Sequence, residues 1–208
     1  MHSSSHNPVV LIHGIDDTAA IFDKMAPYLR LQGWQVYSLD LKPNNGDVGL
    51  DQLAQQVVEY INRTFNRDQA IDLIGFSMGG IIGRYYVQRL GGYKRIQRFV
   101  TIASPHHGTW TAYFRPNIGA AQMRRSSAFL TDLNQDVEML DRLNFTSIWT
   151  PLDLMIVPAA SSEMPVGKNV QISVSGHAWM VTDPRSLQAI ATALAEPLKN
   201  TPRVSLST

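Results

Sequence analysis

Short apolar runs alternate with amphipathic stretches along the chain. Six runs are nearly continuous in hydrophobic residues, which is typical of buried strands, and they cover residues 9–13, 36–40, 71–77, 99–104, 148–153 and 170–175. Apolar residues recur at i, i+3, i+4 and i+7 over residues 50–65, and shorter helices are predicted over 78–90 and 186–198. This alternation predicts a mainly parallel sheet with helices on both faces.

One segment interrupts the alternation. Residues 105–146 contain no convincing strand, and we interpret them as an insertion at one end of the sheet. A chain of 208 residues fits one α/β domain, predicted over residues 7–208. The first six residues, MHSSSH, do not resemble a signal sequence, so we interpret them as a leader or a vector-derived remnant.

Composition excludes several classes of protein. The chain is 44% hydrophobic and 17% charged with a net charge of +1, so neither disorder nor nucleic-acid binding is expected. It has no cysteine, which excludes disulfide scaffolds, thiolate zinc sites and a cysteine nucleophile. No run approaches the ~20 apolar residues of a membrane span. The sequence favours a cytoplasmic location, with secretion after loss of a signal as the alternative.

The most specific motif is Gly75-Phe76-Ser77-Met78-Gly79, which matches G-x-S-x-G. It lies between a predicted strand and a predicted helix, where this motif holds a nucleophilic serine on a sharp turn. The flanking glycines let the strand and helix approach closely. We therefore predict that Ser77 is a nucleophile at the carboxyl edge of the sheet. A glycine-rich corner with an exposed serine is the alternative.

The motif and its surroundings resemble the α/β-hydrolase superfamily. The segments PVVLIHGI (8–15), DLIGFSMGG (72–80), SPHHGT (104–109), FTSIWTPLDLMIVP (145–158) and NVQISVSGH (169–177) are similar to small bacterial triacylglycerol lipases of the Bacillus lipase A type. This resemblance implies a minimal α/β-hydrolase fold with about six strands. Two features depart from that group: Phe76 stands where a histidine is common, and the 105–146 insertion, a candidate partial lid, lengthens the chain.

A nucleophilic serine needs a histidine base and a carboxylate that orients it. In this fold the chain order is serine, acid, histidine, and His177 satisfies it with an acid between. The resemblance places the acid at Asp153. The rival carboxylates are Asp132, Asp136, Asp141 and Glu163.

Acyl transfer also needs backbone N–H groups aimed at the oxyanion. The N–H of Met78, directly after the nucleophile, is one expected donor. The resemblance assigns the other to Ile15. We interpret His13 as a structural residue, and the pair His106-His107 as loop architecture. No metal and no cofactor are expected, because no metal-binding spacing accompanies these histidines.

Apolar residues beside the predicted site fit an acyl chain. The expected substrate-binding residues are Gly14, Phe76, Leu154 and Met155. We therefore predict a serine lipase or carboxylesterase that forms an acyl-Ser intermediate. The alternatives are a thioesterase, acyltransferase or amidase on the same fold, or a non-catalytic binding protein.

The expected partners are a lipid or small ester and, transiently, a lipid surface, which Arg124 and Arg125 could contact. The protein is expected to be a monomer. A second basic stretch is predicted to be a solvated face opposite Ser77, and it consists of Arg84, Arg89, Lys94, Arg95 and Arg98.

Overall fold

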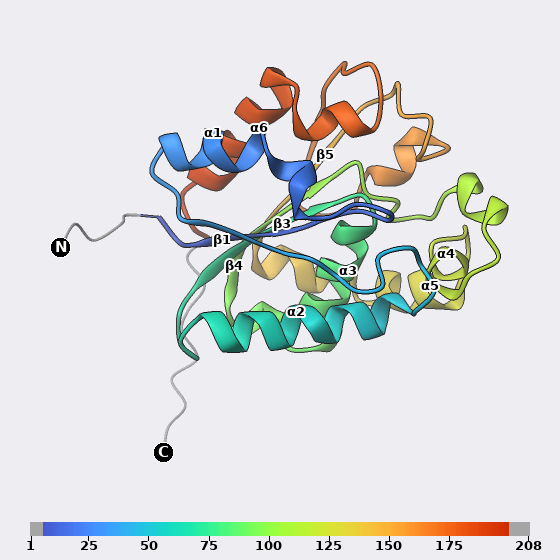
Figure 1. Cartoon of the computed structure of the whole chain (residues 1–208), viewed down its shortest axis with the longest axis horizontal. Helices are drawn as coiled ribbons and strands as arrows, with labels where there is room; N and C mark the ends of the chain where they lie inside the picture. The colour runs from blue at the N-terminus through green and yellow to red at the C-terminus, as the bar shows by residue number, and fades with distance from the viewer. Residues whose placement is uncertain (1–5, 200–208) are drawn as a thin grey trace.

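The computed structural model describes residues 6–199 and contains a six-stranded sheet (Figure 1). The strands are β1 (Val9–Ile12), β2 (Val36–Leu39), β3 (Ile71–Phe76), β4 (Ile96–Ile102), β5 (Asn144–Trp149) and β6 (Lys168–Gln171). Their spatial order is β2-β1-β3-β4-β5-β6, and every neighbouring pair is parallel. All carboxyl ends therefore meet at one edge, as the alternating pattern predicts.

Helices cover both faces of the sheet. Figure 1 shows α1 (Met25–Leu31) and α6 (Pro184–Ala195) on one face, and α2 (Leu50–Thr64) and α3 (Met78–Arg89) on the other. Successive residues of β1 alternate between these layers: Val10 and Ile12 pack in the α2/α3 cluster, and Val9 and Leu11 in the α1/α6 cluster. The central strands are thus buried on both sides, which explains their continuous apolar runs.

The 105–146 insertion consists of short helices. These are η3 (Trp110–Phe114), α4 (Ile118–Gln122), α5 (Ala128–Gln135) and η4 (Val137–Arg142). The remaining short helices are η1 (Ala19–Phe22), η2 (Gly92–Lys94), η5 (Ala159–Ser162) and η6 (Ala178–Val181). Figure 1 shows α4 projecting at the right-hand end of the molecule.

Three predicted strands are displaced along the chain, and β4 covers Ile96–Ile102 where 99–104 was predicted. β5 begins at Asn144, inside the predicted insertion, and ends at Trp149 before a turn that contains Pro151. Proline has no N–H to donate to a ladder, so the strand stops short of Asp153. β6 covers Lys168–Gln171, earlier than the predicted 170–175. It is an edge strand with mostly exposed residues, so its sequence lacks the apolar run that marks a buried strand.

The basic stretch is not a uniform solvated face. Arg84 is fully buried, and its guanidinium donates to the carbonyl of Leu133 at 2.9 Å and to Asn134 Oδ1 at 3.0 Å. Burial lowers the pKa of Arg84 to about 9. Arg89 forms ion pairs with Asp132 and Asp136. The expectation was wrong for these arginines because α5 packs on α3, and they join the two helices.

The ends of the chain add two observations. His6 stacks on Trp34 with ring centroids 4.5 Å apart, while the rest of the predicted leader lies outside the described residues. Between residues 6 and 199, no helix combines the length and apolar character needed to cross a bilayer.

Candidate active site

Ser77 occupies the turn between β3 and α3. Its backbone has φ 53° and ψ −122°, a conformation that residues other than glycine rarely adopt. The Ser77 N–H donates to the carbonyl of Ile102 at 2.8 Å, which fixes the turn to the end of β4. A Cβ on Gly79 would lie 2.2 Å from the carbonyl oxygen of Ile12. The turn is therefore held by close backbone contacts, and its strain is imposed by the surrounding structure.

The loop after β1 passes directly beside Ser77. A Cβ added to Gly14 would lie 3.1 Å from Ser77 Cβ and 2.8 Å from Asp17 Oδ2. Asp16 has φ 61°, and its N–H donates to the carbonyl of Asn44 at 2.9 Å. Burial raises the pKa of the Asp17 carboxyl, and the nearby His13 and His177 oppose that rise. This tight turn brings Ile15 to the same cavity as Ser77.

Two backbone N–H groups flank the serine. Met78 is the first residue of α3, so its N–H has no partner within the helix. The N–H of Ile15 has no hydrogen-bond acceptor among residues 6–199. Both groups are therefore available to an oxygen atom bound next to Ser77.

Asp153 and His177 are joined by a hydrogen bond. The distance from His177 Nδ1 to Asp153 Oδ2 is 2.7 Å, and the Asp153 side chain is almost wholly buried. Asp153 Oδ1 accepts from the N–H groups of Met155 at 2.8 Å and Ile156 at 2.9 Å. An acceptor at Nδ1 favours the tautomer that carries its proton there, which leaves Nε2 able to accept a proton.

The imidazole of His177 also packs against the turn. Its ring lies 4.9 Å from the ring of Phe76, the residue directly before the serine. Within residues 6–199, Ser77 Oγ has no hydrogen bond to His177. Such bonds are often long until a substrate is bound, so the arrangement is compatible with proton transfer.

The remaining histidines have other partners. His13 is buried, lies 2.8 Å from the carbonyl of Gly14 through Nδ1, and accepts the N–H of Leu41 at Nε2 over 2.9 Å. It joins two loops, as expected for a structural residue. His106 Nε2 lies 2.9 Å from Thr101 Oγ1. No cluster of three metal-ligating side chains occurs in the part of the chain that the structure describes.

The rival carboxylates do not contact His177. Asp132 and Asp136 bind Arg89, and Asp141 lies 3.5 Å from Lys199. Among the described residues, the only carboxylate within hydrogen-bond distance of the His177 ring is that of Asp153.

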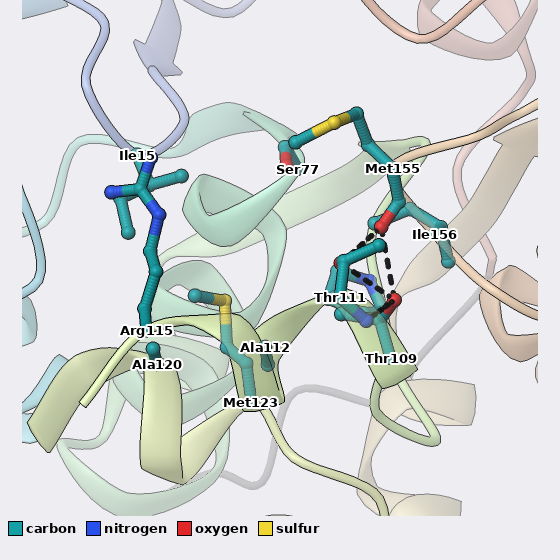
Figure 2. Close-up of a pocket in the computed structure, with 11 residues that line it drawn as sticks. Ile15, Ser77, Thr109, Thr111, Ala112, Arg115, Ala120, Met123, Met155 and Ile156 are labelled. Carbon is teal, nitrogen blue, oxygen red and sulfur yellow. Dashed lines mark hydrogen bonds between the residues drawn. The ribbon is translucent and has the colours of Figure 1, made fainter. Parts of the chain in front are cut away.

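A cavity lies beside Ser77, with a total empty volume of about 450 Å³ when the part open to solvent is included. Figure 2 shows its lining side chains around a common space, with Ser77 between Ile15 and Met155. The lining residues come from four segments and are Ile15, Ser77, Pro105, Thr109, Thr111, Ala112, Arg115, Ala120, Met123, Met155 and Ile156. Most of these side chains are apolar, and the insertion supplies the largest share.

Of the four residues expected to bind substrate, only Met155 lines this cavity. Phe76 is buried against His177, Gly14 lies beneath the serine, and Leu154 is 82% exposed. Sequence reasoning missed the lining from the insertion, including Thr109, Thr111 and Met123. The insertion follows β4, the strand next to β3, so its position along the chain was the signal that could have placed its residues beside Ser77.

A family model described as palmitoyl protein thioesterase matches residues 8–113, half of the chain, which include Ser77 and the loop after β1. The chain belongs to the palmitoyl protein thioesterase family. The finer resemblance to the Bacillus lipase A group is not confirmed.

Several solved structures share the fold of this family member. Bacillus licheniformis lipase BlEst2 in its mature form has a TM-score of 0.71 and 14% identity, covering 91% of this chain and 92% of that one. Aspergillus fumigatus lipase B has a TM-score of 0.78 and 16% identity over 98% of this chain and 56% of its own. The thioesterase domain from the curacin biosynthetic pathway has a TM-score of 0.65 and 17% identity, covering 92% of each chain. The fold is that of the α/β-hydrolases, as the resemblance implied.

Proposed function

We propose that the protein is a serine hydrolase that cleaves carboxylic esters of apolar acyl chains through an acyl-Ser77 intermediate. The observation that carries this proposal is the hydrogen bond between His177 Nδ1 and Asp153 Oδ2, beside a serine on a strained strand-to-helix turn. A buried carboxylate that holds the imidazole leaves Nε2 to remove the serine proton.

In the first half of the reaction, His177 Nε2 takes the proton from Ser77 Oγ, and Oγ attacks the ester carbonyl carbon. The N–H groups of Ile15 and Met78 stabilise the oxyanion of the tetrahedral intermediate. The carbon–oxygen bond to the leaving group then breaks, and His177 gives its proton to the departing alkoxide. An acyl-Ser77 ester and an alcohol result.

In the second half, His177 removes a proton from water, and the hydroxide attacks the acyl carbonyl carbon. The bond to Ser77 Oγ breaks, and the serine recovers its proton from His177. The carboxylic acid leaves, and Asp153 stays ionised throughout while it stabilises the imidazolium.

The cavity favours an acyl chain as the part of the substrate that is bound. Its walls include Ile15, Met123, Met155 and Ile156, and apolar walls are typical of sites that bury hydrocarbon. The proposed substrates are therefore lipid esters, with small esters as weaker ligands.

Thioester hydrolysis is the second candidate, and the family match favours it. The matching family is named for palmitoyl protein thioesterases, and one structural neighbour is a thioesterase domain. The same three side chains serve both reactions, because only the leaving atom changes from oxygen to sulfur.

A matched substrate series distinguishes the two candidates. Butyryl and palmitoyl groups are each presented as an oxygen ester and as a thioester, and kcat/KM is measured for all four compounds. A higher kcat/KM for the palmitoyl oxygen ester than for the other three compounds supports lipid-ester hydrolysis. A higher kcat/KM for a thioester than for both oxygen esters supports the second candidate. A fluorophosphonate probe followed by peptide mapping tests the shared mechanism, which labelling at any residue other than Ser77 would overturn.

A further inference from the structure

The short helix η3 presents two chemically different sides. Thr111, Ala112 and Arg115, the last just after the helix, line the cavity beside Ser77. Trp110 and Tyr113 are about half exposed, and Phe114 is 88% exposed. Neither the core nor the cavity uses these three aromatic side chains. Contiguous exposed apolar side chains of this size mark an interaction surface.

The apolar surface continues onto the loop that follows Asp153. Thr109 Oγ1 and Thr111 Oγ1 lie 2.9 Å and 2.6 Å from the carbonyl oxygen of Met155, as Figure 2 shows. The Trp110 N–H donates to the carbonyl of Val157 at 2.9 Å. These bonds bring exposed Leu154 and half-exposed Met155 beside η3. We call Trp110, Tyr113, Phe114, Leu154 and Met155 the apolar rim.

Two arginines border the apolar rim. The Arg124 guanidinium carbon lies 5.2 Å from the Tyr113 ring centroid, and that of Arg125 lies 5.6 Å from the Trp110 ring centroid. Between residues 6 and 199, neither arginine forms an ion pair with a carboxylate. Arg115, by contrast, is paired with Asp16.

The two segments that form this region carry no negative charge. Residues 105–131 contain three arginines and no Asp or Glu, and residues 154–162 contain no charged residue. Arg124 donates to the carbonyl of Arg115 at 3.0 Å, a bond that leaves its positive charge without a carboxylate partner. Exposed aromatic rings beside arginines that lack carboxylate partners are complementary to the interface of an anionic bilayer, where rings enter the headgroup region and cations meet phosphate.

We propose that the apolar rim, with Arg124 and Arg125, docks the protein on a negatively charged phospholipid surface. Docking by this face turns the mouth of the cavity toward the bilayer, because η3 and Met155 contribute to both. The inference goes beyond the proposed hydrolysis, since docking requires no chemistry at Ser77.

Vesicle sedimentation tests the proposal with the full chain carrying Ser77→Ala. The probes are vesicles of phosphatidylcholine alone and vesicles of phosphatidylcholine mixed with phosphatidylglycerol. We expect at least ~tenfold tighter binding to the mixed vesicles, weakening as salt is added. Absence of binding to the mixed vesicles overturns the proposal, whether or not the active protein hydrolyses esters.

Two matched pairs of variants locate the surface. Phe114→Ser removes an apolar side chain that is 88% exposed, and Leu31→Ser removes one of equal exposure on α1. The first variant should weaken binding ~tenfold and the second should leave it unchanged. Arg125→Glu should likewise weaken binding to the mixed vesicles by ~tenfold or more, compared with Arg67→Glu at an exposed site beyond the end of α2.

Controls separate docking from folding and from a protein partner. Each variant should keep its melting temperature and, with Ser77 restored, its turnover of a water-soluble butyrate ester. Equal losses in the Leu31 and Arg67 variants contradict the proposed location. If Phe114→Ser weakens binding of an S-palmitoyl peptide but not of vesicles, the rim docks an acylated protein and the proposal is wrong.

Discussion

At the scale of single residues, the site depends on positions where the backbone restricts the side chain. Ser77 is held at φ 53° by a hydrogen bond to Ile102, and Gly14 lies so close that a Cβ there would be 3.1 Å from Ser77 Cβ. A residue forced into this region stores strain of order 1–3 kcal/mol. The nucleophile is thus held in place at the expense of local stability.

Ser77→Gly should separate activity from stability. Glycine relieves the strain, although its greater freedom in the unfolded chain offsets part of the gain, so we expect the free energy of unfolding to rise by ~1 kcal/mol. Hydrolysis should fall by several orders of magnitude because the nucleophile is lost. Ser77→Ala is the matched control, since it also removes Oγ but keeps the strain. Equal melting temperatures for the two variants would contradict this account.

Gly14→Ala should impair turnover more than folding. The Asp17 carboxylate, 2.8 Å from the new methyl group, can rotate away, but the 3.1 Å contact with Ser77 Cβ pushes the loop carrying Ile15 away from the serine by a few tenths of an ångström. Complete removal of an oxyanion donor typically lowers kcat by ~10²–10³-fold, so we expect this smaller displacement to lower kcat by ~tenfold. Steady-state kinetics and thermal melting check this together. A variant with wild-type kcat would show that the loop position does not control the reaction.

At the scale of elements, the nucleophile helix lies unusually close to the first strand. A Cβ on Gly79 would lie 2.2 Å from the backbone of Ile12, whereas one on Gly83 would meet the side chain of Phe99 at 2.8 Å. Backbone cannot yield as a side chain can, so these two of the three glycines in α3 are not equivalent.

Gly79→Ala should therefore destabilise the protein far more than Gly83→Ala. We expect losses of ~3 kcal/mol or more for the first and ~1 kcal/mol for the second, even though alanine favours a helix at both positions. Urea unfolding of both variants measures the difference. A smaller loss for Gly79→Ala than for Gly83→Ala would refute the close contact between α3 and β1.

Strands were predictable from the sequence where helices cover both faces of the sheet. β1 and β3 are covered on both faces, so their apolar runs located them well. The edge strand β6 was displaced because it is mostly exposed. β5 was displaced for another reason: it is buried, but Asn144, Thr146 and Ser147 interrupt its apolar run. The cavity walls at Thr109 and Met123 come from short turns without periodicity. Motif residues such as Ser77 were identifiable because the motif itself encodes the tight turn.

At the scale of the whole molecule, the sheet unites residues from distant parts of the chain. The family match ends at residue 113, while Asp153 and His177 follow β5 and β6. Parallel strands bring their carboxyl ends to one edge, so the fold can join the two halves. The hydrogen bond between these residues depends on tertiary structure that no local pattern contains.

Stability should fall as the pH is lowered from about 7 toward about 5. Burial, aided by the nearby Arg84, holds the pKa of His106 well below its usual value, and burial also lowers that of His107. The unfolded chain therefore binds protons that the native state does not, which reduces the free energy of unfolding as pH decreases. His106 alone contributes up to ~1.4 kcal/mol per pH unit in this range.

Urea unfolding at several pH values tests this dependence. His106→Gln keeps a polar group near Thr101 but cannot titrate, so its stability should change less with pH than that of the unaltered protein. An identical pH dependence in both proteins would mean that His106 is protonated in the native state.

The anchoring of Asp153 has a consequence for how this site can diversify. Its carboxylate is oriented by the main-chain N–H groups of residues 155 and 156, whose side chains also line the cavity. Every amino acid except proline supplies such an N–H. Substitutions at both positions can therefore reshape the cavity for longer or shorter acyl chains, while Asp153 keeps the main-chain hydrogen bonds that orient it toward His177.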